Sequence, residues 1–107
     1  MKSKTTIIIV VLILFAITFA YQLYRHEDAH HQIFRQFGCN STIEFDWMTF
    51  TAKTIPSEGC RGSEAMATMH AMNEIVSYNL EAIEIMIMIV LVTYIWICPT
   101  LNKETDN

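Results

Sequence analysis

The sequence predicts a mainly α-helical membrane protein, with two transmembrane helices flanking a small external α+β segment. Three observations predict it: an uncharged apolar run, a second apolar run near the other end, and a stretch rich in β-branched and aromatic residues between them. At 107 residues the chain is at most one small domain. We therefore expect an N-terminal tail, a transmembrane helix, an external segment, a second transmembrane helix and a C-terminal tail, at residues 1–4, 5–24, 25–80, 81–101 and 102–107.

The first apolar run, TTIIIVVLILFAITFAYQLY from Thr5 to Tyr24, contains no charged residue. About 20 residues is the length that a helix needs to cross the hydrocarbon layer. Lys2 and Lys4 precede it without a nearby acid, whereas residues 25–80 carry four basic and seven acidic residues. The positive-inside rule therefore predicts that both termini are cytoplasmic and the central segment is extracytoplasmic. A cleaved signal peptide is the alternative interpretation of this run.

The second apolar run, Ile85 to Cys98, is shorter than a full span. It reaches spanning length when residues 80–84 and 99–101 lie in the two interfacial zones. Glu81 and Glu84 are then expected at the level of the lipid headgroups.

The external segment is predicted to begin as a continuation of the first helix. Residues 24–37 contain no Gly or Pro, and Gly38 is a typical residue just after a helix end. Residues 41–55, STIEFDWMTFTAKTI, read as one strand, or as two strands with a turn near residues 46–49. After a loop, Ser63 is predicted to cap a helix that continues into the second apolar run.

The segment HEDAH carries the first candidate functional residues. His26 and His30 are four residues apart, so on a helix they can present two imidazole nitrogens to one metal ion. Glu27 can take a proton from a metal-bound water, as in an HExxH site. His31 points about 100° away from His30 on a helix and is expected to face solvent.

A third ligand is predicted on the second helix, where His70, Glu74 and Tyr78 follow one another at intervals of four. Glu74 is the expected ligand, which gives a His-His-Glu set with an open position for water. His70 is the rival ligand, or a hydrogen-bond donor to the reacting carbonyl oxygen. Tyr78 can also donate to that oxygen.

HEDAH followed by Asn73-Glu74-Ile75-Val76-Ser77 resembles the two-part signature of gluzincin metallopeptidases, HExxH and a later NExxS. The wider pattern resembles small membrane-anchored HExxH proteins of archaea and bacteria. The resemblance implies a zincin-like external segment, zinc held by His26, His30 and Glu74, and Glu27 as general base. The gluzincin pattern continues to an aspartate that orients a ligand histidine, and here that position is Tyr78.

Zincin-like enzymes hold an extended peptide against an edge strand, and residues 41–55 are the candidate for that strand. The aromatic residues of this stretch, Phe45, Trp47 and Phe50, are expected to pack over the helices or to lie at the headgroup layer.

Cys39 and Cys60 both fall in the external segment, where an oxidising compartment would let them form a disulfide. Two free thiols are the alternative. Cys98 lies in the second apolar run and is expected to behave as a small hydrophobic residue. The net charge of −4 argues against a nucleic-acid partner.

The function that these residues predict is that of a membrane-anchored zinc metallopeptidase, which hydrolyses peptides or proteins at the membrane surface through a zinc-activated water. A second hypothesis is a non-catalytic, zinc-stabilised two-span interaction protein, in which the metal only joins two helices. A third is a two-span interaction protein that binds no metal.

Overall fold

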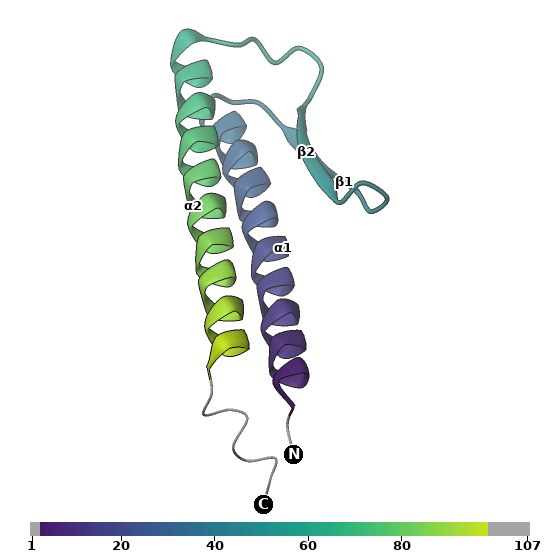
Figure 1. Cartoon of the computed structure of the whole chain (residues 1–107). Helices are drawn as coiled ribbons and strands as arrows, with labels where there is room; N and C mark the ends of the chain where they lie inside the picture. Colours follow the sequence, from purple (N-terminus) through teal and green to yellow (C-terminus); the bar gives the residue numbers. More distant parts are fainter. Residues whose placement is uncertain (1–2, 99–107) are drawn as a thin grey trace, which may run out of the picture.

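Two long antiparallel helices lie side by side, and the segment that connects them contains a β-hairpin (Figure 1). The computed structural model describes residues 3–98. Its elements in chain order are α1 (Lys4–Gln36), β1 (Ser41–Asp46), β2 (Thr51–Pro56) and α2 (Glu64–Ile97). The predicted mainly helical class with a small β segment is confirmed. The predicted C-terminal tail and the first two residues lie outside the described residues.

The end of α1 is fixed by a Schellman motif. Gly38 adopts a left-handed conformation with φ of 75°, which a glycine adopts without steric cost. Its N–H donates to the Arg35 carbonyl at 3.0 Å, and the N–H of Cys39 donates to the Phe34 carbonyl at 2.9 Å. The predicted helix end at Phe37 is confirmed, and the chain leaves it with Cys39 turned back toward the helix pair.

The residues between the helices form two strands, so the two-strand alternative is confirmed. β1 and β2 pair antiparallel, with Ser41 opposite Pro56 and Asp46 opposite Thr51, around a turn at residues 47–50. At the base of the hairpin, His31 Nδ1 lies 2.6 Å from Ser41 Oγ. The expectation that His31 faces solvent is therefore wrong: it is half-buried and holds the hairpin to α1.

A disulfide joins Cys39 to Cys60, so the loop before α2 is tied to the end of α1. The small core lies beside it and consists of Ile33, Cys39 and Met66, with Phe34, Cys60 and Met69 packed against them. Ser63 accepts a hydrogen bond from the Met66 N–H, as predicted for the residue that caps α2. Cap, core and disulfide together fix how α2 starts relative to the end of α1.

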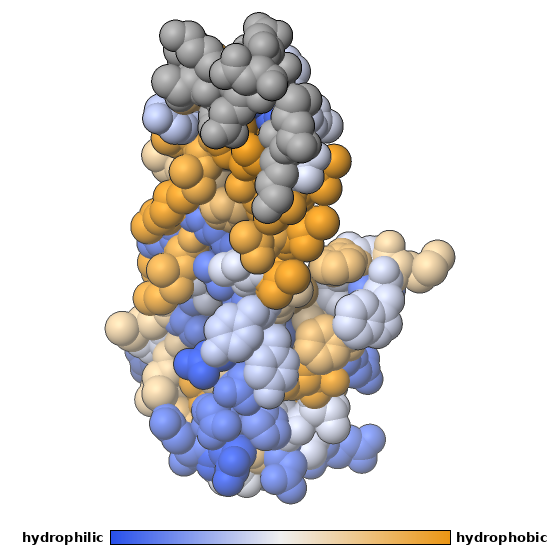
Figure 2. Space-filling model, turned by 90° about the horizontal axis from the view of Figure 1, so that it is seen from below, coloured by the Kyte–Doolittle hydropathy of each residue, from blue (hydrophilic) through white to orange (hydrophobic). Residues whose placement is uncertain are grey.

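The two helices are long and apolar enough to cross a membrane, by length and composition. More than half of their large apolar side chains are exposed, and water would disfavour so large an exposed apolar surface. Figure 2 shows the hydrophobic colour gathered over the part of the helix pair nearest the chain ends and the hydrophilic colour over the other part.

The far ends of the helices are held by a hydrogen bond from Lys4 Nζ to the Trp96 carbonyl at 3.0 Å. Lys4 and Trp96 therefore lie at the same level of the antiparallel pair. Glu84 lies twelve residues before Trp96, and Ala16 lies twelve residues after Lys4. Because both helices rise equally per residue, Glu84 lies level with the middle of the apolar run of α1. If the two helices span a membrane, this register would place Glu84 deeper than the headgroup level expected for it.

Glu84 is only 7% exposed, on the face of α2 that also buries Met66 and Ile95. Neither of its carboxylate oxygens has a hydrogen-bond partner among residues 3–98. A buried polar group without a partner costs about 1–3 kcal/mol of stability. Glu84 is therefore a local weak point of the helix pair.

Replacing Glu84 by Met is expected to raise the free energy of unfolding by about 1–3 kcal/mol, because the unpartnered carboxylate is removed at similar volume. Denaturant unfolding in detergent micelles measures the change. Glu81→Met is the matched control, since Glu81 is half-buried on the same helix and should change stability less. A Glu84→Met protein less stable than wild type would contradict the expectation.

Candidate metal centre

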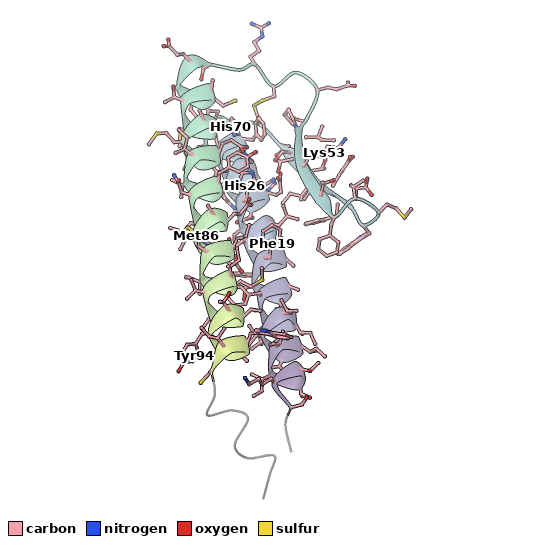
Figure 3. All side chains as sticks on the ribbon, in the orientation of Figure 1. Phe19, His26, Lys53, His70, Met86 and Tyr94 are labelled. Atoms are coloured by element: carbon pink, nitrogen blue, oxygen red, sulfur yellow. A yellow bond between two sulfur atoms is a disulfide. The ribbon has the colours of Figure 1, made fainter. Side chains whose placement is uncertain are left out.

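Three ligand atoms from two helices converge on one point. His26 Nε2 and His30 Nε2, one turn apart on α1, lie 3.2 Å from each other. Glu74 Oε1, on α2, lies 3.3 Å from the His26 nitrogen and 2.8 Å from the His30 nitrogen. Figure 3 shows His26 between the helices, below His70. The sequence predicted these three residues as ligands, and the structure brings them together.

No placement of protons on His26 and His30 gives all three close contacts a favourable hydrogen bond. If both imidazole Nε2 atoms carry a proton, both can donate to Glu74, but two N–H groups then face each other. If His26 instead donates to His30, the lone pair of the His30 nitrogen is used up and that nitrogen has no proton for Glu74. A cation would accept a lone pair from all three atoms. Tetrahedral bonds of zinc length place neighbouring ligand atoms roughly 3.3 Å apart, close to the observed spacing.

His70 lies behind His30 and outside the three-ligand group. Its Nδ1 is 2.6 Å from His30 Nδ1. When His30 Nε2 binds a metal, its proton is on Nδ1 and can be donated to His70, which fixes the orientation of the ring. Burial, and then the neighbouring His30, lower the pKa of His70 and so favour its neutral, accepting form.

Glu27 is 5% exposed and lies beside the three ligand atoms. Its Oε1 is 3.7 Å from His26 Nε2. Its Oε2 accepts a hydrogen bond of 2.6 Å from the Thr54 hydroxyl, which also lies 3.0 Å from the Glu27 carbonyl oxygen. The hairpin thus holds one carboxylate oxygen and leaves the other facing the ligands.

Tyr78 lies one turn beyond Glu74 on α2 and is mostly exposed. The negative charge of Glu74, together with a hydrogen bond between the two side chains, raises the pKa of Tyr78. The phenol therefore keeps its proton at neutral pH and remains a donor.

A cavity of about 380 Å³ gives access to these groups. The two helices contribute His26, His30, Glu74 and Tyr78 to its lining, and β2 contributes its middle residues. The cavity therefore lies between the helix pair and the hairpin, and it is large enough for part of a peptide chain.

Two supporting residues were not identified from the sequence. Asn73 donates from Nδ2 to the His26 carbonyl at 3.3 Å and so links the helices at the ligand itself. The adjacent Asn-Glu pair was a sequence signal for it, although no role was assigned. Thr54 had no signal, because only the packing of the hairpin against α1 brings it to Glu27.

No protein-family model, curated protein or solved structure matches the chain.

Purified wild-type protein is expected to bind about one transition-metal ion per chain, because three converging ligands suit a mononuclear site. His30→Ala and Glu74→Ala should each lose most of it, since each removes one of three ligands. Elemental analysis of detergent-purified protein, prepared without chelators, gives the metal-to-chain ratio.

His31→Ala is the matched control, because His31 lies next to a ligand but binds Ser41 instead. It should retain the metal. A wild-type protein that takes up no metal after reconstitution would show that His26, His30 and Glu74 do not form a metal site.

Proposed function

We propose that this protein is a membrane-anchored zinc peptidase that hydrolyses peptide bonds at the membrane surface. The observation that carries the proposal is the convergence of His26 Nε2, His30 Nε2 and Glu74 Oε1 beside the buried carboxylate of Glu27. A purely structural metal site has no need of a carboxylate at that place. The resemblance to gluzincin signatures supports the same chemistry.

Zinc is the metal that suits this donor set. Two imidazoles and one carboxylate, with a fourth position open to a cavity, are typical of catalytic zinc. Bound there, zinc would lower the pKa of a water molecule and polarise the carbonyl of the scissile bond.

The protein groups move the protons. Glu27, through Oε1, takes a proton from the attacking water as the water oxygen bonds to the carbonyl carbon. Glu27 then delivers that proton to the amide nitrogen as the C–N bond breaks, which leaves a carboxylic acid and an amine. Tyr78 donates a hydrogen bond to the carbonyl oxygen while negative charge develops on it. His70 acts as a positioning residue through His30.

β2 offers a place for the peptide backbone. One of its edges pairs with β1, and the sheet has two strands among residues 3–98, so within that range its other edge is unpaired. Ala52, Lys53 and Thr54 of this strand line the same cavity as the ligands. An extended peptide could pair with that edge and bring one carbonyl to the centre. The position of β2 beside the ligands supports this proposed role.

The external location of the site is part of the proposal. The Cys39–Cys60 disulfide is typical of an oxidising compartment, which supports an extracytoplasmic central segment. Lys2 and Lys4 before the first apolar run support a cytoplasmic N-terminus. With two spans, both termini then lie in the cytoplasm.

Glu27→Gln is expected to keep the metal and the fold but to lower peptide hydrolysis by about 10²–10⁴-fold, because glutamine accepts no proton. Zinc-loaded protein in lipid nanodiscs, incubated with a library of internally quenched peptides, gives the rate, and elemental analysis gives the zinc content. If the wild type, with zinc bound, cleaves no more than Glu27→Gln, the non-catalytic zinc-stabilised alternative is correct.

Thr54→Val is expected to slow hydrolysis while leaving zinc content unchanged, because it removes the hydrogen bond that holds Glu27 without touching a ligand. The fall in kcat/KM should correspond to about 1.5–3 kcal/mol of transition-state stabilisation, the range for a hydrogen bond to a charged group. Thr54→Ser keeps the hydroxyl and should retain most activity. Equal losses in both variants would show that Thr54 does not act through this bond.

A further inference from the structure

The end of the hairpin carries a cluster of large apolar side chains exposed to the surroundings. We call Phe45, Trp47, Met48 and Phe50 the hairpin tip. Trp47 is 77% exposed, Met48 96% and Phe50 61%. The sequence predicts that Phe45, Trp47 and Phe50 pack over the helices or lie at the headgroup layer. Trp47 and Phe50 line a small cavity with α1 but stay mostly exposed, and the headgroup position stays a prediction. Asp46 is the only charged residue from 45 to 52.

The hairpin tip lies at the level of the outer end of the apolar run of α1. A small cavity of about 50 Å³ is lined by Ala20 and Leu23 of α1 and by Phe45, Trp47 and Phe50. The apolar run ends at Tyr24. Ala20 lies four residues before that end, and Leu23 lies one residue before it. At about 1.5 Å per residue, the tip is roughly 2–6 Å below that end. Figure 1 shows the hairpin running from the connecting loops back alongside α1.

Some polar groups of the turn are paired within the turn itself. Asp46 accepts hydrogen bonds from the backbone N–H of Met48 at 2.9 Å and of Thr49 at 3.4 Å. The hydroxyl groups of Thr49 and Thr51 bond to each other at 2.7 Å. These contacts reduce the cost of bringing the turn close to hydrocarbon.

Phe50 occupies a backbone conformation that favours glycine. Its φ is 57°, in the left-handed region, which costs a non-glycine residue roughly 1–2 kcal/mol. The ring lies edge-on to Trp47, with centroids 6.4 Å apart, and lines the small cavity beside α1, but it is still mostly exposed.

We propose that the hairpin tip inserts into the boundary between headgroups and acyl chains of the outer leaflet, as a third lipid contact beside the two helices. The inference rests on the proposal that α1 and α2 cross the membrane. A lipid surface fits better than a protein groove, because the tip projects at the depth where tryptophan and phenylalanine partition and continues the apolar surface of α1.

Insertion would also hold the candidate metal centre at a fixed height. Thr54, which donates a hydrogen bond to Glu27, lies three residues along β2 from Thr51, the residue that directly follows Phe50 of the hairpin tip. A tip anchored in lipid therefore fixes the strand that lines the cavity, and it sets the cavity facing peptide that lies along the membrane surface. The substrate class that follows is the membrane-proximal segment of a polypeptide.

The two tryptophans, Trp47 and Trp96, provide the test. Trp96→Phe leaves Trp47 as the sole tryptophan, and Trp47→Phe leaves Trp96. Each variant is reconstituted into phosphatidylcholine vesicles whose lipids carry bromine at a shallow or a deep acyl position, and fluorescence is compared with vesicles without bromine. Trp47 is expected to lose fluorescence to shallow bromine more than to deep bromine, with emission shifted to the blue.

Trp96 reports separately whether the helices are in the membrane. Quenching of Trp96 without quenching of Trp47 would overturn tip insertion and leave the two spans intact. Absence of quenching for both would overturn the spans and the tip together. A blue-shifted Trp47 that bromine does not quench would mean that the tip is covered by protein, which also overturns the inference. None of these results depends on zinc content or peptide hydrolysis.

Phe50→Gly separates insertion from hairpin stability. It relieves the left-handed strain, so thermal stability in detergent should be unchanged or higher, while quenching of Trp47 by shallow bromine should fall. Thr42→Ala, an exposed change on β1 distant from the tip, is the matched control and should leave the quenching unaltered. Unaltered quenching in Phe50→Gly would overturn a lipid contact for that ring.

Discussion

The structure depends on the antiparallel register of α1 and α2. His26 and His30 lie on one face of α1, and Glu74 lies on the face of α2 that meets it. Sliding one helix by a single turn, about 5.4 Å, would separate His26 and His30 from Glu74. Links at the two opposite ends of the helix pair hold that register. At one end, the Schellman turn and the disulfide tie the end of α1 to the start of α2. At the other, Lys4 bonds to the Trp96 carbonyl. Between them the described core is small, so local links rather than bulk burial fix the alignment.

The polar groups buried between the two helices differ in how many hydrogen-bond partners they have. The candidate metal centre and Glu84 are the two contrasting cases. At the metal centre, imidazole and carboxylate atoms crowd together, and a cation would resolve their contacts. At Glu84 the carboxylate has no partner among the described residues and no neighbouring cluster. The first arrangement would gain stability from a metal ion, whereas the second weakens the helix pair. A protein of this size retains such groups at a cost in stability, which favours a functional origin for the crowded site.

Much of the fold and of the ligand set could be predicted from the sequence, because both are encoded in local spacing. His26 and His30 at four residues, the glycine after Phe37 and the cap at Ser63 act within one or two helical turns. Contacts across elements could not be predicted in the same way. Thr54 reaches Glu27, and His31 reaches Ser41, only because the hairpin folds back along α1. Likewise, the depth of Glu84 follows from the register between helices, which no single segment specifies.

The hairpin connects the candidate metal centre to the exposed hairpin tip. β2 packs against α1 through the bond between Thr54 and Glu27, and its other end carries the exposed hairpin tip. In the proposed mechanism, Glu27 faces the attacking water and is held by a strand whose position an inserted tip would set. Because a two-stranded hairpin is only marginally stable in water by itself, contacts on both of its sides would determine how rigidly Glu27 is held. Under these two proposals the lipid surface would be a structural element of the site, and a soluble fragment without it would hold the Glu27 carboxylate less firmly.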